Sequence, residues 1–197
     1  PSSAASDVYK RQVKVIRVRS GRTLASILSK ILQKVSPFMA ESGADGRIIR
    51  LRCIRPGLSG KIWAIIEFIS MLPVILYNVH LPLIRGKIVI AERYILDAIV
   101  SIAYFTRMPK LLEHRLCDLM LRFIPQKTIF IHLDCPYNAV RNRRGKKAER
   151  ERYYKFQQAL YNILSERIRA YTIDTSVYAV GETAKHICQY VLKNIYK

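Results

Sequence analysis

A short apolar run that ends in charged residues is the feature that most constrains the fold of this chain. Ile88, Val89, Ile90 and Ala91 are followed at once by Glu92-Arg93-Tyr94. Successive β-branched residues without polar alternation predict a strand buried on both faces, as in a parallel sheet. Ligands of open α/β sheets bind outside the carboxyl ends of such strands. The chemistry of this chain is therefore expected where a carboxylate and a guanidinium follow the strand.

Strands and helices are predicted to alternate along the rest of the chain. Apolar spacing and turn residues predict strands at 13–18, 88–91, 128–134 and 171–174, and helices at 23–32, 61–83, 95–103, 111–123, 156–168 and 184–195. The helix at 61–83 should bend at Pro73 and Pro82. Residues 36–60 are rich in glycine and predict a long loop. This order predicts one α/β domain with a parallel sheet.

The charge of the chain points to an anionic partner. There are 34 lysines and arginines against 14 acidic residues, for a formal charge of +20. Such an excess suits a nucleotide, a nucleic acid or an anionic membrane, although a generally basic surface gives the same count. The four cysteines form no C-x-x-C pair, which predicts reduced thiols and a cytoplasmic location.

The most apolar stretch of the chain has the composition of a possible membrane span. Residues 62–79 are interrupted by Glu67 and Pro73, whereas a membrane span needs about 20 nearly uninterrupted apolar residues. We therefore expect a buried helix and no membrane partner.

Residues 1–12 have no periodicity and no apolar face, which predicts a non-native or disordered segment preceding the folded domain at 13–197.

Charged residues follow three of the predicted strands. These residues are Arg17 and Arg19, Glu92 and Arg93, and Asp134. If the strands are parallel, their carboxyl ends meet at one edge of the sheet. Guanidinium groups bind phosphate in a bidentate manner, and a carboxylate can hold the water of a bound Mg²⁺. This edge is thus expected to suit a polyphosphate with magnesium.

A second cluster of charge lies at 141–155, with eight lysines and arginines against two glutamates. A solvated helix face is one interpretation. A second is a lid whose arginines close over a transferring phosphoryl group. A third is a nucleic-acid surface, which is weaker because Tyr153 and Tyr154 are the only aromatic residues within it.

Several segments, in order, resemble one known family. The run from Leu81 to Tyr94 is similar to the approach to an Asp-Arg-Tyr/His motif, and Leu133-Asp134-Cys135-Pro136, with Arg143 nine residues after Asp134, is similar to a fourth strand and a lid arginine. Tyr161 before Leu164, and Ile173-Asp174-Thr175 before the last helix, fit the usual ending. Residues 13–197 thus resemble the thymidylate kinase family of nucleoside monophosphate kinases, especially its archaeal thymidylate-kinase-like branch.

The resemblance implies a three-layer P-loop kinase-like α/β fold that uses ATP and Mg²⁺ to phosphorylate a nucleoside monophosphate. It also allows a homodimer. By position, it implies catalytic roles for Glu92, Arg93, Arg143 and Arg144, acceptor binding by Arg19, Arg93, Tyr94 and Asp97, ATP contacts by Arg143 and Lys146 in a lid at about 141–155, and magnesium beside Glu92.

The chain departs from the family pattern at three places. Glu92 replaces the commoner Asp and is longer by one methylene, roughly 1.5 Å. This difference matters because a displacement of about 1 Å can cost ~10²-fold in rate. Asp97 and Ser101 follow Tyr94 without the usual Ala-Tyr-Gln, so thymine recognition is not implied. There is no G-x-x-x-x-G-K-[ST] phosphate loop.

The nearest string to that loop runs from Ile16 to Thr23, but Ile16 stands where its first glycine belongs and cannot adopt the required backbone. We therefore expect the loop, and the central first strand of the sheet, upstream of Val13. This sequence alone is then expected to be an inactive fragment that does not bind ATP. Its sheet should be interrupted between the strands that end at Glu92 and Asp134. The alternatives are a basic nucleic-acid-binding module and a non-catalytic protein with the kinase fold.

Overall fold

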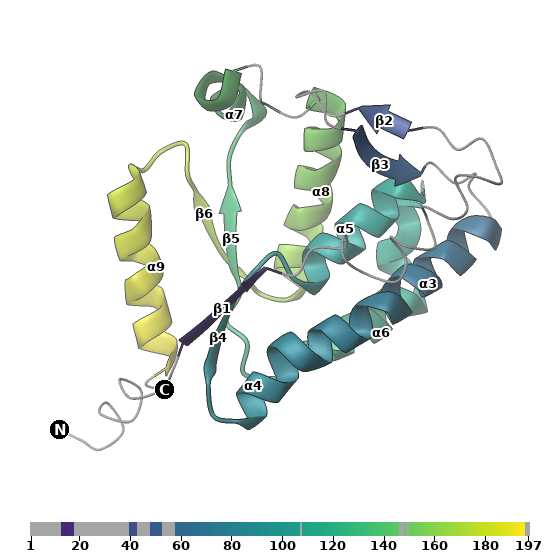
Figure 1. Cartoon of the computed structure of the whole chain (residues 1–197). Helices are drawn as coiled ribbons and strands as arrows, with labels where there is room; N and C mark the ends of the chain where they lie inside the picture. The colour runs from purple at the N-terminus through teal and green to yellow at the C-terminus, as the bar shows by residue number, and fades with distance from the viewer. Residues whose placement is uncertain are drawn as a thin grey trace. The chain divides into compact units, whose positions relative to one another are not determined.

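The computed structural model describes residues 13–17, 40–42, 48–52, 58–106, 108–145, 148 and 150–195. The chain forms two compact units, and each is considered by itself. Unit 1 comprises Pro1–Phe38 and Cys53–Pro125, and unit 2 comprises Met39–Arg52 and Gln126–Lys197. Figure 1 labels the elements of both units.

Unit 1 combines a parallel pair of strands with a layer of helices. Strand β1 (Val13–Arg17) pairs with β4 (Ile88–Glu92) in a register that sets Val13 opposite Ile88 and Arg17 opposite Glu92. The helical segments are α3 (Leu58–Ile75), η2 (Leu76–His80), α4 (Leu81–Ile84), α5 (Ile95–Phe105), η3 (Pro109–Glu113) and α6 (Arg115–Arg122). The helix predicted at 61–83 is thus observed as three consecutive segments, with Pro73 inside α3 and Pro82 in the first turn of α4.

The core of unit 1 lies between α3 and the helices that follow β4. Its most buried apolar side chains include Ala64, Phe68, Met71, Ile75, Ile95, Ile99, Ile102, Leu111, Cys117 and Met120. The rings of Phe68 and Phe123 meet edge to face with their centroids 5.4 Å apart. One face of α3 and one face of α5 therefore supply the same core.

A glycine turn delivers the chain from α4 into β4. Gly86 has a φ of +74°, its N–H donates to the carbonyl of Leu83 at 2.9 Å, and the N–H of Lys87 donates to the carbonyl of Pro82 at 3.0 Å. These two bonds define a Schellman motif, in which the left-handed residue is normally glycine. The helix end and the start of β4 are therefore fixed relative to each other by backbone hydrogen bonds.

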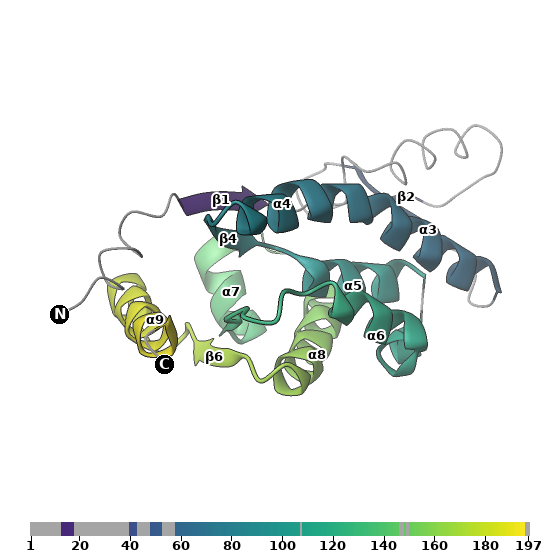
Figure 2. The ribbon, with the colours of Figure 1, turned by 90° about the horizontal axis from the view of Figure 1, so that it is seen from below.

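Unit 2 is a three-layer arrangement around a second parallel pair. Strands β5 (Ile131–Asp134) and β6 (Tyr171–Asp174) are joined through α7 (Tyr137–Arg144) and α8 (Glu151–Arg167), and α9 (Val180–Ile195) follows β6. His132 faces Tyr161 of α8, whereas Tyr171 stacks on Tyr190 of α9 with ring centroids 4.0 Å apart. Because neighbouring positions of a strand point to opposite faces, α8 and α9 cover opposite faces of this sheet (Figures 1 and 2).

The strands confirm the mixed α/β class and form separate ladders. The described strands form three separate pairs, β1–β4, β5–β6 and the antiparallel pair β2 (Ala40–Ser42) and β3 (Ile48–Arg52). No ladder joins β4 of unit 1 to β5 of unit 2 among the described residues. The interruption of one sheet between Glu92 and Asp134, and the three-layer P-loop kinase fold, stay predictions.

Three predictions about elements were wrong. Residues 40–42 and 48–52, expected within a loop, pair as β2 and β3. The helix expected at 111–123 is divided at His114, whose Nδ1 accepts the N–H of Leu116 at 3.2 Å and caps α6. β4 is not buried on both faces, since Ile90 is 53% exposed. A ladder of two strands, which is what the described residues provide, leaves part of each face open.

Other expectations need only small changes or fall outside the described residues. The helices α5, α8 and α9 and the strands β1, β4 and β6 lie where they were predicted, although α8 and α9 begin a turn or more earlier and β5 covers only the end of 128–134. The segment 1–12, the helix at 23–32, Arg19 and Lys146 lie outside the described residues.

Candidate functional site

The end of β4 holds the most unusual backbone of unit 1. Glu92 ends the strand opposite Arg17, Arg93 follows with a φ of +60°, and α5 begins at Ile95. Left-handed backbone costs a residue other than glycine roughly 1–2 kcal/mol, and such residues cluster at functional sites. The sequence retains an arginine at a position where glycine would be easier to accommodate.

The Arg93 side chain is held near the first turn of α5. Its Nη1 lies 3.5 Å from Oδ1 of Asp97, and the two side chains are 48% and 19% exposed. An exposed pair at this spacing contributes only about 0.3–0.5 kcal/mol, so it orients the guanidinium more than it stabilises the protein. A guanidinium has five N–H donors, which leaves it able to bind a phosphate while it contacts one carboxylate.

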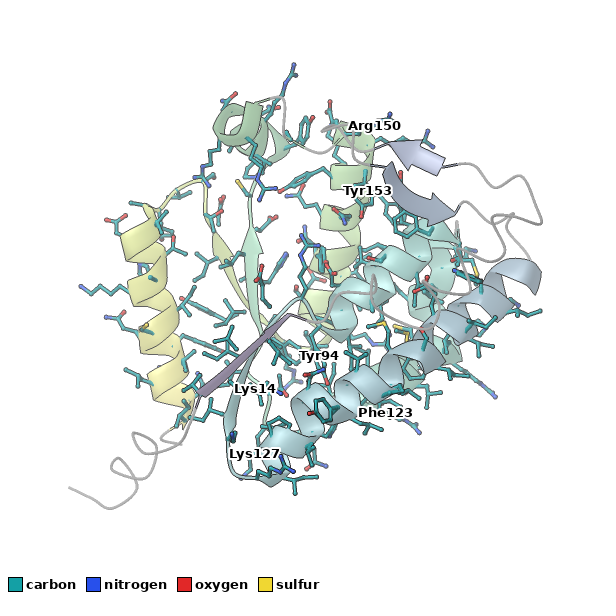
Figure 3. All side chains as sticks on the ribbon, viewed as in Figure 1. Lys14, Tyr94, Phe123, Lys127, Arg150 and Tyr153 are labelled. Atoms are coloured by element: carbon teal, nitrogen blue, oxygen red, sulfur yellow. The ribbon has the colours of Figure 1, made fainter. Side chains whose placement is uncertain are left out.

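Tyr94 anchors this strand end to the C-terminal end of α6. Its hydroxyl donates to the carbonyl of Phe123 at 3.2 Å, and Nε2 of His80 lies 3.0 Å from the same oxygen. Burial raises the pKa of Tyr94 to about 12. Figure 3 shows Tyr94 and Phe123 close to each other in unit 1. Tyr94, expected to bind substrate, therefore has a positioning contact on its hydroxyl.

Glu92 is the residue expected beside magnesium. It is exposed at the end of β4. Among the described residues, no group of three or more His, Cys, Asp or Glu could hold a metal ion. Mg²⁺ is commonly bound by one or two carboxylates together with substrate phosphates and water. A magnesium role for Glu92 would need further ligands from outside this carboxylate, and it stays a prediction.

The carboxyl ends of β5 and β6 form a hydrogen-bonded edge in unit 2. Asp134 stands opposite Asp174 in the ladder, and Gln158 of α8 donates to Oδ1 of Asp134 at 2.8 Å. Hydrogen bonds from the Ser176 hydroxyl and N–H lower the pKa of Asp174. Both carboxylates at this edge are thus engaged by neighbours within the unit.

Arg143 is tied into the same edge. Its Nη2 donates to the carbonyl of Thr175 at 2.5 Å, and its Nη1 lies 4.0 Å from the sulfur of Cys135. The guanidinium therefore links α7 to the segments that follow β5 and β6. Arg144, its neighbour, is exposed. Of the two predicted lid arginines, Arg143 has a positioning role in this structure and Arg144 is accessible to a ligand.

The start of α8 lies beside α7 and completes an exposed cationic corner. We define the α7–α8 corner by four of its exposed arginines, which are Arg141, Arg144, Arg150 and Arg152. Tyr154 donates its hydroxyl to the carbonyl of Cys135 at 2.6 Å, and its ring lies 5.5 Å from that of Tyr137. Figure 3 labels Arg150 and Tyr153 at the start of α8. The corner therefore combines arginines with an anchored pair of aromatic rings.

The structure brings together some of the predicted site residues. Glu92, Arg93, Tyr94 and Asp97 gather at the end of β4, and Asp134, Arg143 and Arg144 belong to unit 2. The expected meeting of all three strand ends at one edge stays a prediction.

Sequence reasoning missed the roles of Gln158, Tyr154 and Thr175. The spacing of Tyr154 and Gln158, one turn apart on α8, was a signal that both side chains face the same way.

Comparison with known proteins adds no assignment. No model of a known protein family matches the chain, and no curated protein matches it.

Proposed function

We propose that this chain carries the acceptor-binding half of a nucleoside monophosphate kinase of the thymidylate kinase type. The observation that carries the proposal is the left-handed Arg93, half-exposed at the carboxyl end of a parallel strand. A guanidinium at such a strand end suits the phosphate of a monophosphate acceptor. Asp97 orients it, and Tyr94 fixes the backbone beside it.

In this proposal the remaining parts of the reaction come from other groups. An oxygen of the acceptor phosphate attacks the γ-phosphorus of ATP, the bond from that phosphorus to the bridging oxygen breaks, and ADP leaves. Glu92 would supply one ligand to Mg²⁺, which neutralises the phosphate charge. Arg144 would act as a lid arginine on the ATP side. The sequence contains no G-x-x-x-x-G-K-[ST] loop, so we expect it to bind the acceptor without turnover.

The proposal is tested by acceptor binding to the chain as it stands. Isothermal titration with a panel of nucleoside monophosphates should show binding that Arg93→Ala weakens by about 10–100-fold, the range expected for hydrogen bonds to a charged group. Arg122→Ala removes an exposed cation at the end of α6 in the same unit and should leave binding unchanged. Equal loss in both variants, or no binding to wild type at millimolar ligand, would contradict the proposal.

A second candidate is favoured by the α7–α8 corner, where four exposed arginines accompany the Tyr137 and Tyr154 rings. Arginines beside aromatic rings are the means by which proteins hold single-stranded nucleic acid. The observation to make is the slope of log affinity for an oligonucleotide against log salt, which should flatten by about 0.7 for each arginine removed. A slope that the removal of Arg141 and Arg150 leaves unchanged would exclude this candidate.

A further inference from the structure

Helix α3 and its continuation through η2 and α4 are apolar on two opposite faces. The inner face carries Ala64, Phe68, Met71 and Ile75, which are at most 3% exposed. The opposite face carries large apolar side chains that are 45–82% exposed; we call this set the outer stripe, and it consists of Ile62, Ile65, Ile69, Leu76, Tyr77 and Ile84. The expectation that 62–79 is a buried helix therefore holds for one face only. By length and composition, Gly60–Ile84 is the one described helix that could also cross a membrane, which is weak evidence by itself.

The outer stripe lies at the upper end of the apolar patch sizes found on monomeric proteins. Six side chains, each about half exposed or more, present on the order of 600 Å² of apolar surface. The largest apolar patch of a typical monomer is about 300–600 Å², and such a patch is often functional. The stripe is, however, smaller than the roughly 800 Å² per partner of a stable protein–protein interface. Its size suits shallow insertion into a soft apolar phase better than a rigid dimer.

Three described cations flank the outer stripe. Lys61 and Arg85 are exposed at its two ends, and Nζ of Lys14 lies 5.7 Å from the centre of the Tyr77 ring. The acidic residue of this helix, Glu67, lies one turn from the buried Trp63 and Met71, away from the stripe. No acidic side chain therefore stands among the described residues of the stripe.

This pattern disfavours a second copy of the chain as the occupant. A parallel pairing of two stripes would bring Lys61 to Lys61 and Arg85 to Arg85, and an antiparallel pairing would bring Lys61 to Arg85. Both arrangements set like charges against each other, and the formal charge of +20 adds long-range repulsion between copies. With an anionic lipid surface, both the contact between charges at the ends of the stripe and the long-range force on the net charge become attractive. Lysines and arginines at an apolar face are attracted to anionic headgroups.

We propose that the outer stripe docks on the surface of an anionic lipid bilayer, lying in the interface without crossing it. The apolar side chains would enter the boundary between headgroups and acyl chains, while Lys61, Arg85 and Lys14 would contact anionic headgroups. This binding site shares no residue with the end of β4 and does not depend on the nucleotide proposal.

The test is co-sedimentation with vesicles of phosphatidylcholine, with and without phosphatidylserine. Wild type should bind the phosphatidylserine vesicles and lose binding as salt is raised. The triple variant Ile62→Ser/Ile69→Ser/Leu76→Ser should bind at least about tenfold more weakly, since it removes half of the apolar contacts. Leu119→Ser/Ile163→Ser/Leu192→Ser replaces three equally exposed apolar residues elsewhere and should bind like wild type.

A second pair of variants tests the charges. Lys61→Gln/Arg85→Gln should weaken vesicle binding by roughly fivefold for each cation removed, whereas Lys185→Gln/Lys193→Gln on α9 should have no specific effect. Trp63 fluorescence verifies that unit 1 of each variant is folded, and circular dichroism verifies the helices of both units. The proposal is overturned if both triple variants lose binding equally, if wild type ignores phosphatidylserine, or if light scattering shows a dimer that the stripe variant alone dissociates. Retained monophosphate binding in the stripe variants would separate this result from the nucleotide proposal.

Discussion

Arg93 adopts a backbone conformation that arginine rarely uses, and its neighbours explain how the chain maintains it. Tyr94 is held at its hydroxyl by the Phe123 carbonyl, and Ile95, buried in the core, begins α5 immediately afterwards. The residue between the end of β4 and these anchors must therefore turn sharply. A left-handed residue at this point aims the side chain at Asp97 while the strand and the helix keep their own geometry.

Replacing Arg93 by glycine should separate stability from binding. Glycine adopts a positive φ without strain, so Arg93→Gly is expected to raise the free energy of unfolding by about 0.5–1 kcal/mol. The same change removes the guanidinium and should weaken monophosphate binding as much as Arg93→Ala does. Urea denaturation of the two variants measures the difference. If the glycine variant is no more stable than the alanine variant, the backbone at this position is not strained.

The residue types at this site could be predicted from the sequence, but their geometry could not. An apolar run followed by Glu92 and Arg93 identifies a strand end with charged groups. The positive φ of Arg93 has no local signal, since no glycine or asparagine marks it. The partner of Tyr94 lies 29 residues away, and a contact of that kind depends on how α6 packs.

At the scale of elements, two left-handed turns end the helices that precede strands. Gly86 ends α4 ahead of β4, and Arg169 ends α8 ahead of β6 with a φ of +54°. At the second turn the N–H of Ala170 donates to the carbonyl of Ser165 at 2.8 Å, and the N–H of Arg169 donates to that of Glu166 at 3.1 Å. The hydrogen bonds match those at Gly86, but only the first turn has the favoured residue.

Arg169→Gly should therefore stabilise unit 2. We expect the free energy of unfolding to rise by about 0.5–1 kcal/mol, because the left-handed cost disappears and exceeds the added flexibility of the unfolded chain. Arg167→Gly, two residues earlier and inside α8, should instead lower it by about 1 kcal/mol. Thermal unfolding followed by circular dichroism distinguishes the two. A loss of stability in both variants would show that the Arg169 side chain itself stabilises the helix end.

Element positions were predictable where one periodicity dominated. The stripes of α5, α8 and α9 and the apolar runs of β1, β4 and β6 gave unambiguous patterns. The pair β2 and β3 was missed because the glycines of residues 36–60 outweighed the alternation in Ile48-Ile49-Arg50-Leu51-Arg52. Asp45-Gly46 between the two strands was a hairpin signal that could have identified them. The break at His114 depends on a side-chain cap that apolar spacing does not predict.

At the scale of the whole molecule, two units with separate cores need not unfold together. The only tryptophan of the chain, Trp63, is buried in unit 1, so its fluorescence reports on that unit. Circular dichroism reports on the helices of both units. In unit 2, His132 has a buried Nδ1 without a hydrogen-bond partner among the described residues. Burial lowers the pKa of His132, and the nearby carboxylate of Asp134 opposes that shift only in part.

Acidification should therefore weaken unit 2 selectively. A histidine whose pKa is lower in the folded state than the usual value of about 6.5 resists protonation there, so the unfolded state binds more protons. The stabilising contribution of neutral His132 is fully present above about pH 6.5 and falls as the pH drops below that value. Between pH 7.5 and 5.5, the circular dichroism midpoint in urea should fall more than the Trp63 midpoint. His132→Gln should reduce this divergence, and His186→Gln should not.

His80 and Tyr94 share the carbonyl oxygen of Phe123. This shared contact allows the end of β4 to be followed by nuclear magnetic resonance of His80. A carbonyl only accepts hydrogen bonds, so His80 must carry a proton on Nε2 whenever both contacts form. The ¹⁵N chemical shifts of a histidine ring distinguish its tautomers, which turns His80 into a natural probe of the end of β4. A ligand that moves Arg93 is expected to shift the neighbouring Tyr94 and its contact with the Phe123 carbonyl. The shift would appear as a change in the ¹⁵N resonances of the His80 ring, which the ligand does not contact.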